Sequence, residues 1–251
     1  MRRLALLLLA STCVLSQTTA TPTLTLAELA NAAKIYLRDS AEFPLDMHLT
    51  MSAVSTSGRV IRADTAEGRY DFHGYNPRSE HGAASFRVTT KGMFHSAKPM
   101  VAPARNSFLA AILPNTVLFK SAADRYSLEM VPSPNPLLLT ARVLPHSPCT
   151  EFKWAGEYNA PETICGSSEF QLQKDDMSLR HFSFEAGALP VLADVKPFGK
   201  CQLQRYHLEA DFQRVTLPND PKPFLVPAHV DVTVETDKGR LRMTTDFEPH
   251  K

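Results

Sequence analysis

The most constraining feature of the chain is the segment FPLDMHLTMS at residues 43–52, in which apolar and polar side chains alternate. A period of two is explained only by a β-strand that buries one face, because successive side chains of a strand point to opposite sides of the sheet. The segment therefore predicts a half-buried strand, with Met47, Leu49 and Met51 facing the interior and Asp46, His48 and Thr50 facing water.

Shorter segments with the same alternation follow along most of the chain. Their spacing, and the turn residues between them, predict antiparallel strands joined as a meander. The strongest hairpin signal is Asp237-Lys238-Gly239, which separates two alternating runs. No helices of comparable quality alternate with the strands, which argues against a parallel α/β sheet with a nucleotide-binding crevice. The predicted strands are 58–65, 68–75, 83–90, 92–97, 116–121, 125–131, 151–158, 167–174, 178–186, 201–214, 224–236 and 239–248.

The first residues have the pattern of a secretory signal peptide. Arg2 and Arg3 precede an apolar run at residues 4–10, and small residues follow at 16–20. We therefore expect residues 1–20 to be removed, and the mature chain, 21–251, to form one domain in the periplasm or outside the cell. No apolar run approaches the roughly 20 residues that a membrane-spanning helix needs, so no transmembrane segment is expected.

One amphipathic helix is predicted after the signal peptide. Apolar side chains recur near helical spacing over Thr23–Arg38. Thr25 is a candidate N-cap, and Glu28 stands three residues later, at the distance of a capping box.

Composition and motifs narrow the class of function. The chain has 27 Lys and Arg against 26 Asp and Glu, which leaves no basic surplus for a nucleic-acid partner. It contains no G-x-S-x-G, H-E-x-x-H, P-loop or G-x-G-x-x-G motif, so we expect no catalytic residue, no cofactor and no metal site. The strand histidines, among them His48, His181 and His207, are interpreted as exposed polar-face residues.

An exported chain meets oxidants, and three cysteines remain after the signal peptide. One disulfide and one free thiol are therefore expected. Three pairings are open, and the one we expect is Cys149–Cys165, because it closes the shortest loop; Cys201 would then be the free thiol.

Residues 99–148 form an apolar insert that is interrupted by eight prolines. Proline removes a backbone donor, so most of this insert is predicted as short helices or turns that lie across the sheet. Within it, residues 105–119 are expected to act as a lid whose Phe108, Ile112 and Leu113 cover the apolar face.

A long antiparallel sheet must cover one apolar face, and this chain offers only one helix and a proline-rich insert for that purpose. We therefore consider that a ligand covers part of the apolar face. Methionine and phenylalanine suit irregular apolar ligands, although a plainly packed core would use the same residues. The candidate ligand-binding residues are Met47, Leu49, Met51, Phe86, Phe108, Ile112, Leu113, Phe119, Phe182 and Phe184.

The order of these features resembles the periplasmic lipoprotein carriers of the Lol system (LolA/LolB-like). The shared features are a signal peptide, an amphipathic helix at 24–37, the FPLDMHLTMS strand, meander strands and a proline-rich apolar insert. The resemblance implies a mainly β fold: an antiparallel, unclosed half-barrel sheet with an N-terminal helix and short lid helices. It also implies a non-enzymatic carrier whose partners are lipids or the acyl chains of lipoproteins.

Two other interpretations of the sequence stay open. In the first, the protein is a structural or protein-interaction module of the cell envelope with a fully packed core. In the second, it is a secreted hydrolase. The extra cysteines and the long insert depart from the Lol carriers, which leaves open whether the cargo is a lipoprotein or another lipid.

Overall fold

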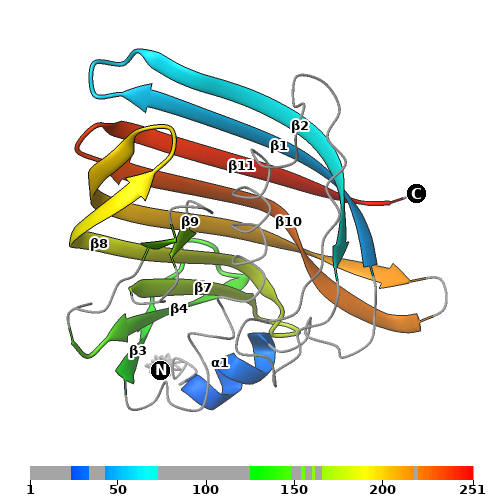
Figure 1. Cartoon of the computed structure of the whole chain (residues 1–251). Helices are drawn as coiled ribbons and strands as arrows, with labels where there is room; N and C mark the ends of the chain where they lie inside the picture. Colours follow the sequence, from blue (N-terminus) through cyan, green and yellow to red (C-terminus); the bar gives the residue numbers. More distant parts are fainter. Residues whose placement is uncertain are drawn as a thin grey trace, which may run out of the picture.

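The structure, a computed structural model, describes residues 24–33, 43–72, 125–147, 154–155, 160–161, 166–217 and 220–250. Its main element is a single antiparallel sheet of nine strands (Figure 1). These strands are β1 (Phe43–Ser55), β2 (Val60–Phe72), β3 (Tyr126–Val131), β4 (Leu138–Pro145), β7 (Ser167–Gln173), β8 (Leu179–Val195), β9 (Gly199–Leu217), β10 (Asp220–Thr236) and β11 (Gly239–Pro249). The other described elements are the helix α1 (Leu26–Ala33) and a small two-stranded sheet of β5 (Trp154–Ala155) and β6 (Ala160–Pro161).

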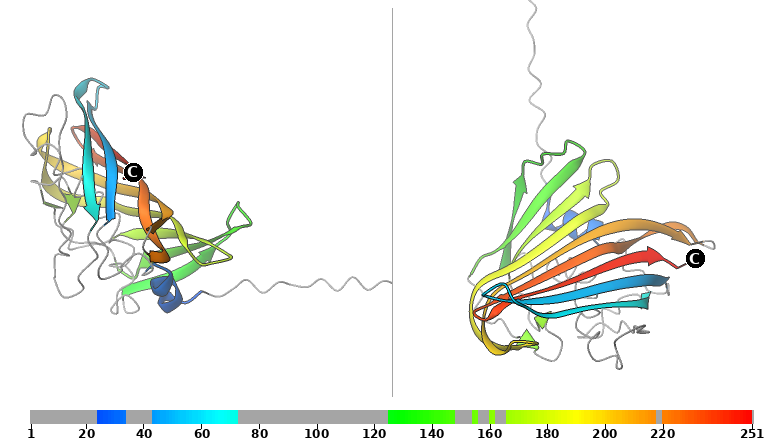
Figure 2. Two further views of the ribbon diagram at one scale, coloured as in Figure 1. Left: turned by 90° about the vertical axis from the view of Figure 1, so that its right-hand side faces the viewer. Right: turned by 90° about the horizontal axis from the view of Figure 1, so that it is seen from above.

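The strand order across the sheet is β2-β1-β11-β10-β9-β8-β7-β4-β3. The N-terminal hairpin therefore pairs with the C-terminal strand β11, while β7 to β11 follow one another as a meander. The edge strands β2 and β3 do not pair with each other, so the sheet is strongly curved but not closed (Figure 2). The predicted fold class, a mainly β protein with an unclosed antiparallel sheet and an N-terminal helix, is confirmed.

Strand β1 has the faces that its alternation predicts. The side chains of Met47, Leu49 and Met51 are 2%, 0% and 6% exposed, whereas Asp46 and His48 are exposed. β1 lies between β2 and β11, and its apolar residues stand opposite residues such as Met243, the register partner of Met51. Strand β1 therefore joins the N-terminal hairpin to the C-terminal strand of the sheet.

Helix α1 begins with the predicted capping box. The backbone N–H of Glu28 donates to the Thr25 hydroxyl at 3.2 Å, and the Thr25 N–H donates to the Glu28 carboxylate at 2.8 Å. These two bonds satisfy backbone donors at the start of the helix. The Thr25 N–H and the Thr25 hydroxyl both donate to the Glu28 carboxylate, and they hold the pKa of Glu28 below its ordinary value. Leu29 is fully buried in the core, so the helix covers part of the sheet's apolar face.

The β10–β11 hairpin also confirms its prediction, and Gly239 shows why the turn needs glycine. Its φ is +155°, and a Cβ there would lie 2.2 Å from the Val54 carbonyl oxygen on the neighbouring strand. No other residue fits this close approach between backbones without a shift of β1.

Two expectations about strands are wrong. Residues 138–145 are not a helix or turn but β4, which pairs with β3 and β7 inside the sheet. Prolines 132, 134 and 136 lie in the β3–β4 connection and Pro145 ends the strand, so the prolines bound this strand without interrupting it. The separate strands 58–65 and 68–75 are one strand, β2, because Gly68 continues the ladder opposite Met47.

Part of the region around the predicted disulfide is described. Within segment 151–158 the structure describes β5, which pairs with β6, whereas β7 pairs with β4 and β8. Cys149 and Cys165 lie outside the described residues, so their pairing stays a prediction, and Cys201 is a buried free thiol.

Several other predicted features lie outside the described residues: the signal peptide at 1–20, the lid at 105–119, and the candidate lining residues Phe86, Phe108, Ile112, Leu113 and Phe119. No helix in the described part of the chain combines the length and the apolar character needed to cross a membrane.

Candidate functional site

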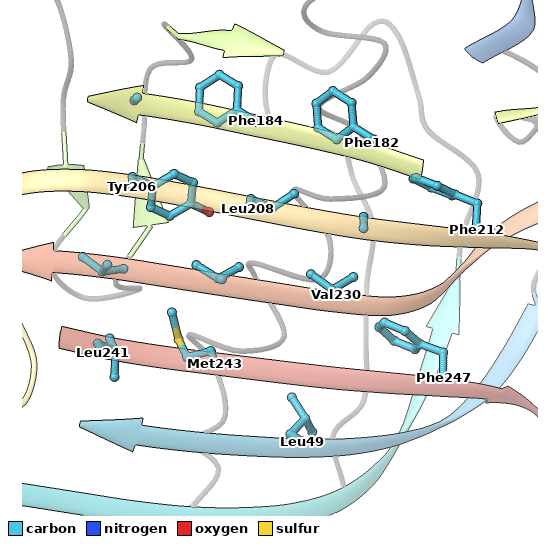
Figure 3. Close-up of a cluster of buried hydrophobic side chains, with 14 of the residues drawn as sticks. Leu49, Phe182, Phe184, Tyr206, Leu208, Phe212, Val230, Leu241, Met243 and Phe247 are labelled. Atoms are coloured by element: carbon cyan, nitrogen blue, oxygen red, sulfur yellow. The ribbon is translucent and has the colours of Figure 1, made fainter. Parts of the chain in front are cut away.

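One face of the nine-stranded sheet is almost entirely apolar, and we call it the inner face. Its largest side chains come from β7, β8 and β9 and include Phe170, Phe182, Phe184 and Tyr206, all 0% exposed. Figure 3 shows side chains of the neighbouring strands β8, β9, β10, β11 and β1 lying together on this face. The residues that Figure 3 labels are Leu49, Phe182, Phe184, Tyr206, Leu208, Phe212, Val230, Leu241, Met243 and Phe247.

The strand register places the inner-face residues in rows that run across the sheet. Side chains directly opposite each other on paired strands share a face, so each row is a continuous band of contacts. One row crosses eight strands and none of its members is more than 3% exposed: Ala141, Phe170, Phe182, Ala210, Val230, Thr245, Leu49 and Ala66. The next row contains Val143, Ser168, Phe184, Leu208, Val232, Met243, Met51 and Asp64.

The two halves of the inner face differ in chemistry. Near β7 to β9 it is aromatic, with edge-to-face contacts between Phe170 and Phe182 (ring centroids 5.0 Å apart) and between Phe184 and Tyr206 (6.2 Å). Near β1 and β11 it contains the methionines Met51 and Met243, whose unbranched side chains adapt to irregular shapes. The aromatic part of the inner face and its more adaptable methionine part therefore lie on either side of β10 in the same sheet.

The inner face becomes polar at the edge strand β2. Arg62 and Asp64 stand opposite Ala53 and Met51, which places both side chains on the inner face, where they form an ion pair with each other. Both are partly buried, with 34% and 17% of their side chains exposed. An amphiphilic ligand on this face would find its polar surroundings at this edge.

A buried serine hydroxyl also lies on the inner face, on β7 and away from β2. Ser168 on β7 is 2% exposed, and its oxygen has no hydrogen-bond partner among the residues that the structure describes. It stands in register with Phe184 and Val143, both fully buried. A buried hydroxyl without a partner destabilises the fold, and a polar atom of a ligand could satisfy it.

Two buried titratable side chains, Tyr206 and Cys201, are unsuited to acid–base chemistry near neutral pH. Complete burial raises the pKa of Tyr206 far above its ordinary value of about 10. Burial also raises the pKa of the Cys201 thiol, which keeps it protonated and a poor nucleophile. The described residues contain no group of three or more His, Cys, Asp or Glu side chains placed to hold a metal ion.

The sequence located part of this face. Met47, Leu49, Met51, Phe182 and Phe184 all lie on it and are buried. The candidate ligand-binding residues did not include Tyr206, Phe170, Leu208, Met243 and Phe247, which also lie on this face. The alternation of apolar and polar residues in 201–214 and 239–248 could have identified most of them. The other face carries a pattern that the sequence did not reveal: His181, His207 and His229 each contact a carboxylate of the sheet.

No family model matches the chain, and no curated protein matches its sequence. Among solved structures, a LolA superfamily protein from Nitrosomonas europaea aligns over 90% of this chain and 92% of its own, with 6% identity and a TM-score of 0.35. A DUF1329 family protein from Desulfovibrio piger aligns over 89% and 91%, with 11% identity and a TM-score of 0.34. Structural similarity at these identities and TM-scores assigns the chain neither a family nor a function.

Proposed function

We propose that the protein is an exported, non-catalytic carrier that binds a lipid, or the acyl chains of a lipoprotein, on the inner face of its open sheet. The observation that carries the proposal is a buried, predominantly apolar face, with one row eight strands wide in which Thr245 alone is polar, on a sheet whose edges do not meet. An acyl chain gains its binding free energy from apolar area removed from water, and needs no specific polar partner along most of its length.

The polar groups on this face support an amphiphilic ligand over a pure hydrocarbon. The Arg62–Asp64 pair lies at one edge and the unpartnered Ser168 hydroxyl lies several strands away. Between them the row that contains Ser168 and Asp64 is wholly apolar: Phe184, Leu208, Val232, Met243 and Met51. The arrangement suits a molecule with an acyl chain and at least one polar end.

The second candidate function is a structural or protein-interaction module of the cell envelope whose core is fully packed. One observation favours it: the inner-face residues are already buried, as in an ordinary hydrophobic core. The two functions differ in whether the space over the inner face can open to admit a ligand.

Two alanines on β2 provide a matched test of this difference. Ala66 is 3% exposed on the inner face, whereas Ala63 is exposed on the opposite face of the same strand. In a carrier, Ala66→Phe occupies space that an acyl chain would use. It should weaken binding of an environment-sensitive fluorescent fatty acid by about tenfold or more, with little change in the urea midpoint. Ala63→Phe should change neither quantity.

The packed-core alternative predicts the opposite result. In that case the wild-type protein binds no fatty acid saturably, and Ala66→Phe overpacks a closed core at a cost of about 1–3 kcal/mol in the free energy of unfolding. Saturable binding that is insensitive to Ala66→Phe would place the ligand elsewhere and would contradict the proposed site.

A further inference from the structure

The face of the sheet opposite the inner face, which we call the outer face, carries an ordered pattern of histidines and carboxylates. Across six neighbouring strands, from β8 through β9, β10, β11 and β1 to β2, the register aligns one residue of each strand in a single row. Imidazole and carboxylate alternate along this row without exception: His181, Asp211, His229, Asp246, His48 and Glu67.

Two neighbouring pairs of side chains in this row are in contact. Nδ1 of His181 lies 2.8 Å from the Asp211 carboxylate, and Nδ1 of His229 lies 2.6 Å from that of Asp246. Asp211 stands between His181 and His229, and Asp246 stands between His229 and His48, so both carboxylates have an imidazole on each side.

Two further rows complete a patch of three residues on each strand, which we call the outer patch. The second row contains Ser183, Glu209, Asp231, Thr244, Thr50 and Thr65, and the third contains Glu185, His207, Thr233, Arg242, Ser52 and Ala63. His207 lies 3.0 Å from the Glu209 carboxylate and 3.5 Å from that of Glu185.

The charges of the outer patch do not balance at neutral pH. It holds six carboxylates, four histidines, one arginine and no lysine. The arginine, Arg242, pairs with Asp231, and Arg205, just outside the patch, pairs with Glu185. With neutral imidazoles the patch has a net charge of minus five; with all four protonated it has minus one.

A sheet face that only needed to be soluble would offset its acidic side chains with lysine or arginine, because like charges on neighbouring strands destabilise pairing. In the row from His181 to Glu67, imidazoles stand beside the carboxylates, where lysine or arginine would be expected. The carboxylates also stay accessible, since the side chains of Asp211, Asp246 and Glu209 are 57%, 54% and 51% exposed. The patch therefore presents accessible carboxylates to solvent, with imidazole hydrogen-bond partners beside them.

We propose that the outer patch is a docking surface for a lysine- or arginine-rich segment of a partner protein, and that mild acidification releases this partner. Charge complementarity selects a basic partner, because the patch is acidic while the whole chain is nearly neutral at +1. Histidine is the side chain whose ordinary charge change falls near physiological pH, so protonation of the four imidazoles would reduce the net charge of the patch from minus five to minus one and weaken the attraction. The proposal is independent of ligand binding on the inner face.

The test uses the full mature chain and a fluorescein-labelled oligolysine peptide as the basic probe, read by fluorescence anisotropy at low ionic strength. We expect saturable binding at about pH 7.5 and an affinity at least about tenfold lower at about pH 5.5. The triple variant His48→Gln, His181→Gln, His229→Gln keeps polar side chains but cannot gain charge there. It should bind as well as the wild type at the higher pH and lose most of the pH dependence.

A charge-matched pair of variants locates the binding surface. Asp211→Asn with Asp246→Asn should weaken binding several-fold at about pH 7.5, while Asp175→Asn with Asp194→Asn, two exposed carboxylates outside the patch, should not. Circular dichroism of each variant checks that the sheet is intact, and Glu67→Gln at the edge of the row serves as a second variant should the double substitution not fold.

Three results would overturn the proposal. The first is equal weakening by the two double variants, which would mean that the peptide responds only to total charge. The second is full pH dependence in the triple histidine variant. The third is stronger binding of anionic phosphatidylglycerol vesicles at about pH 5.5 than of the peptide at about pH 7.5, which would identify a membrane as the partner.

Discussion

The inner and outer faces of the sheet are formed by alternate residues of the same strands, yet one is buried and apolar and the other is exposed and polar. On the inner face Leu49 stands beside Thr245 and Ala66 with no exposed surface, and stabilisation comes from burial. One residue earlier, His48 stands in register between Asp246 and Glu67 on the other face and is exposed. Alternate residues of one strand therefore divide between a buried apolar face, where we propose ligand binding, and an exposed polar face, where we propose partner docking.

The largest contrast should come from placing the same residue at two adjacent positions. Leu49→Asn removes a buried side chain and buries an amide without partners, so we expect a loss of about 3–5 kcal/mol in the free energy of unfolding. His48→Asn, its matched control, should change that free energy by no more than about 0.5 kcal/mol. Urea denaturation measures both, and equal effects would break the distinction between the faces.

Alkaline pH should act through the inner face. The pKa of Tyr206 is raised by burial, so the folded protein keeps this proton where the unfolded chain, with an ordinary tyrosine pKa near 10, releases it. Stability is therefore intact below about pH 10 and falls above it by up to about 1.4 kcal/mol per pH unit. Tyr206→Phe should reduce this loss more than Tyr126→Phe, whose phenol is only partly buried. Chemical denaturation of the wild type and of both variants across this pH range measures the difference in the free energy of unfolding.

The smallest effect is expected on the outer face. Arg205 donates to the Glu185 carboxylate at 2.5 Å and holds its pKa below the ordinary value. The resulting stabilisation exists above that ordinary value and is lost as pH falls. Arg205→Ala should therefore raise the Glu185 pKa, which a carboxyl NMR titration measures, yet cost less than about 1 kcal/mol because both side chains are 41% exposed. A larger cost would show that the outer face contributes to stability after all.

The inner face was partly predictable because burial leaves a period of two within each strand. The alternation of Met47, Leu49 and Met51 identified their face without knowledge of any other strand. Strand β4 was missed because the prolines around it were taken to interrupt the region, whereas they lie only in the turn before it and at its last residue.

The outer patch could not be predicted in the same way. Each of its histidines was interpreted as an ordinary exposed residue, and within one strand that interpretation is sound. The row from His181 to Glu67 exists only through the register of six strands, and register is set by long-range pairing and turn geometry. No pattern local to one segment contains that information.

The central claim is that the inner face holds an acyl ligand, and native mass spectrometry of the purified protein tests it most directly. The protein should carry a non-covalent adduct with the mass of a lipid, which solvent extraction recovers, and Ala66→Phe should lose this adduct while Ala63→Phe keeps it. A spectrum that shows only the mass of the polypeptide, together with no fatty-acid binding by the purified protein, would contradict the claim and would favour a packed envelope module.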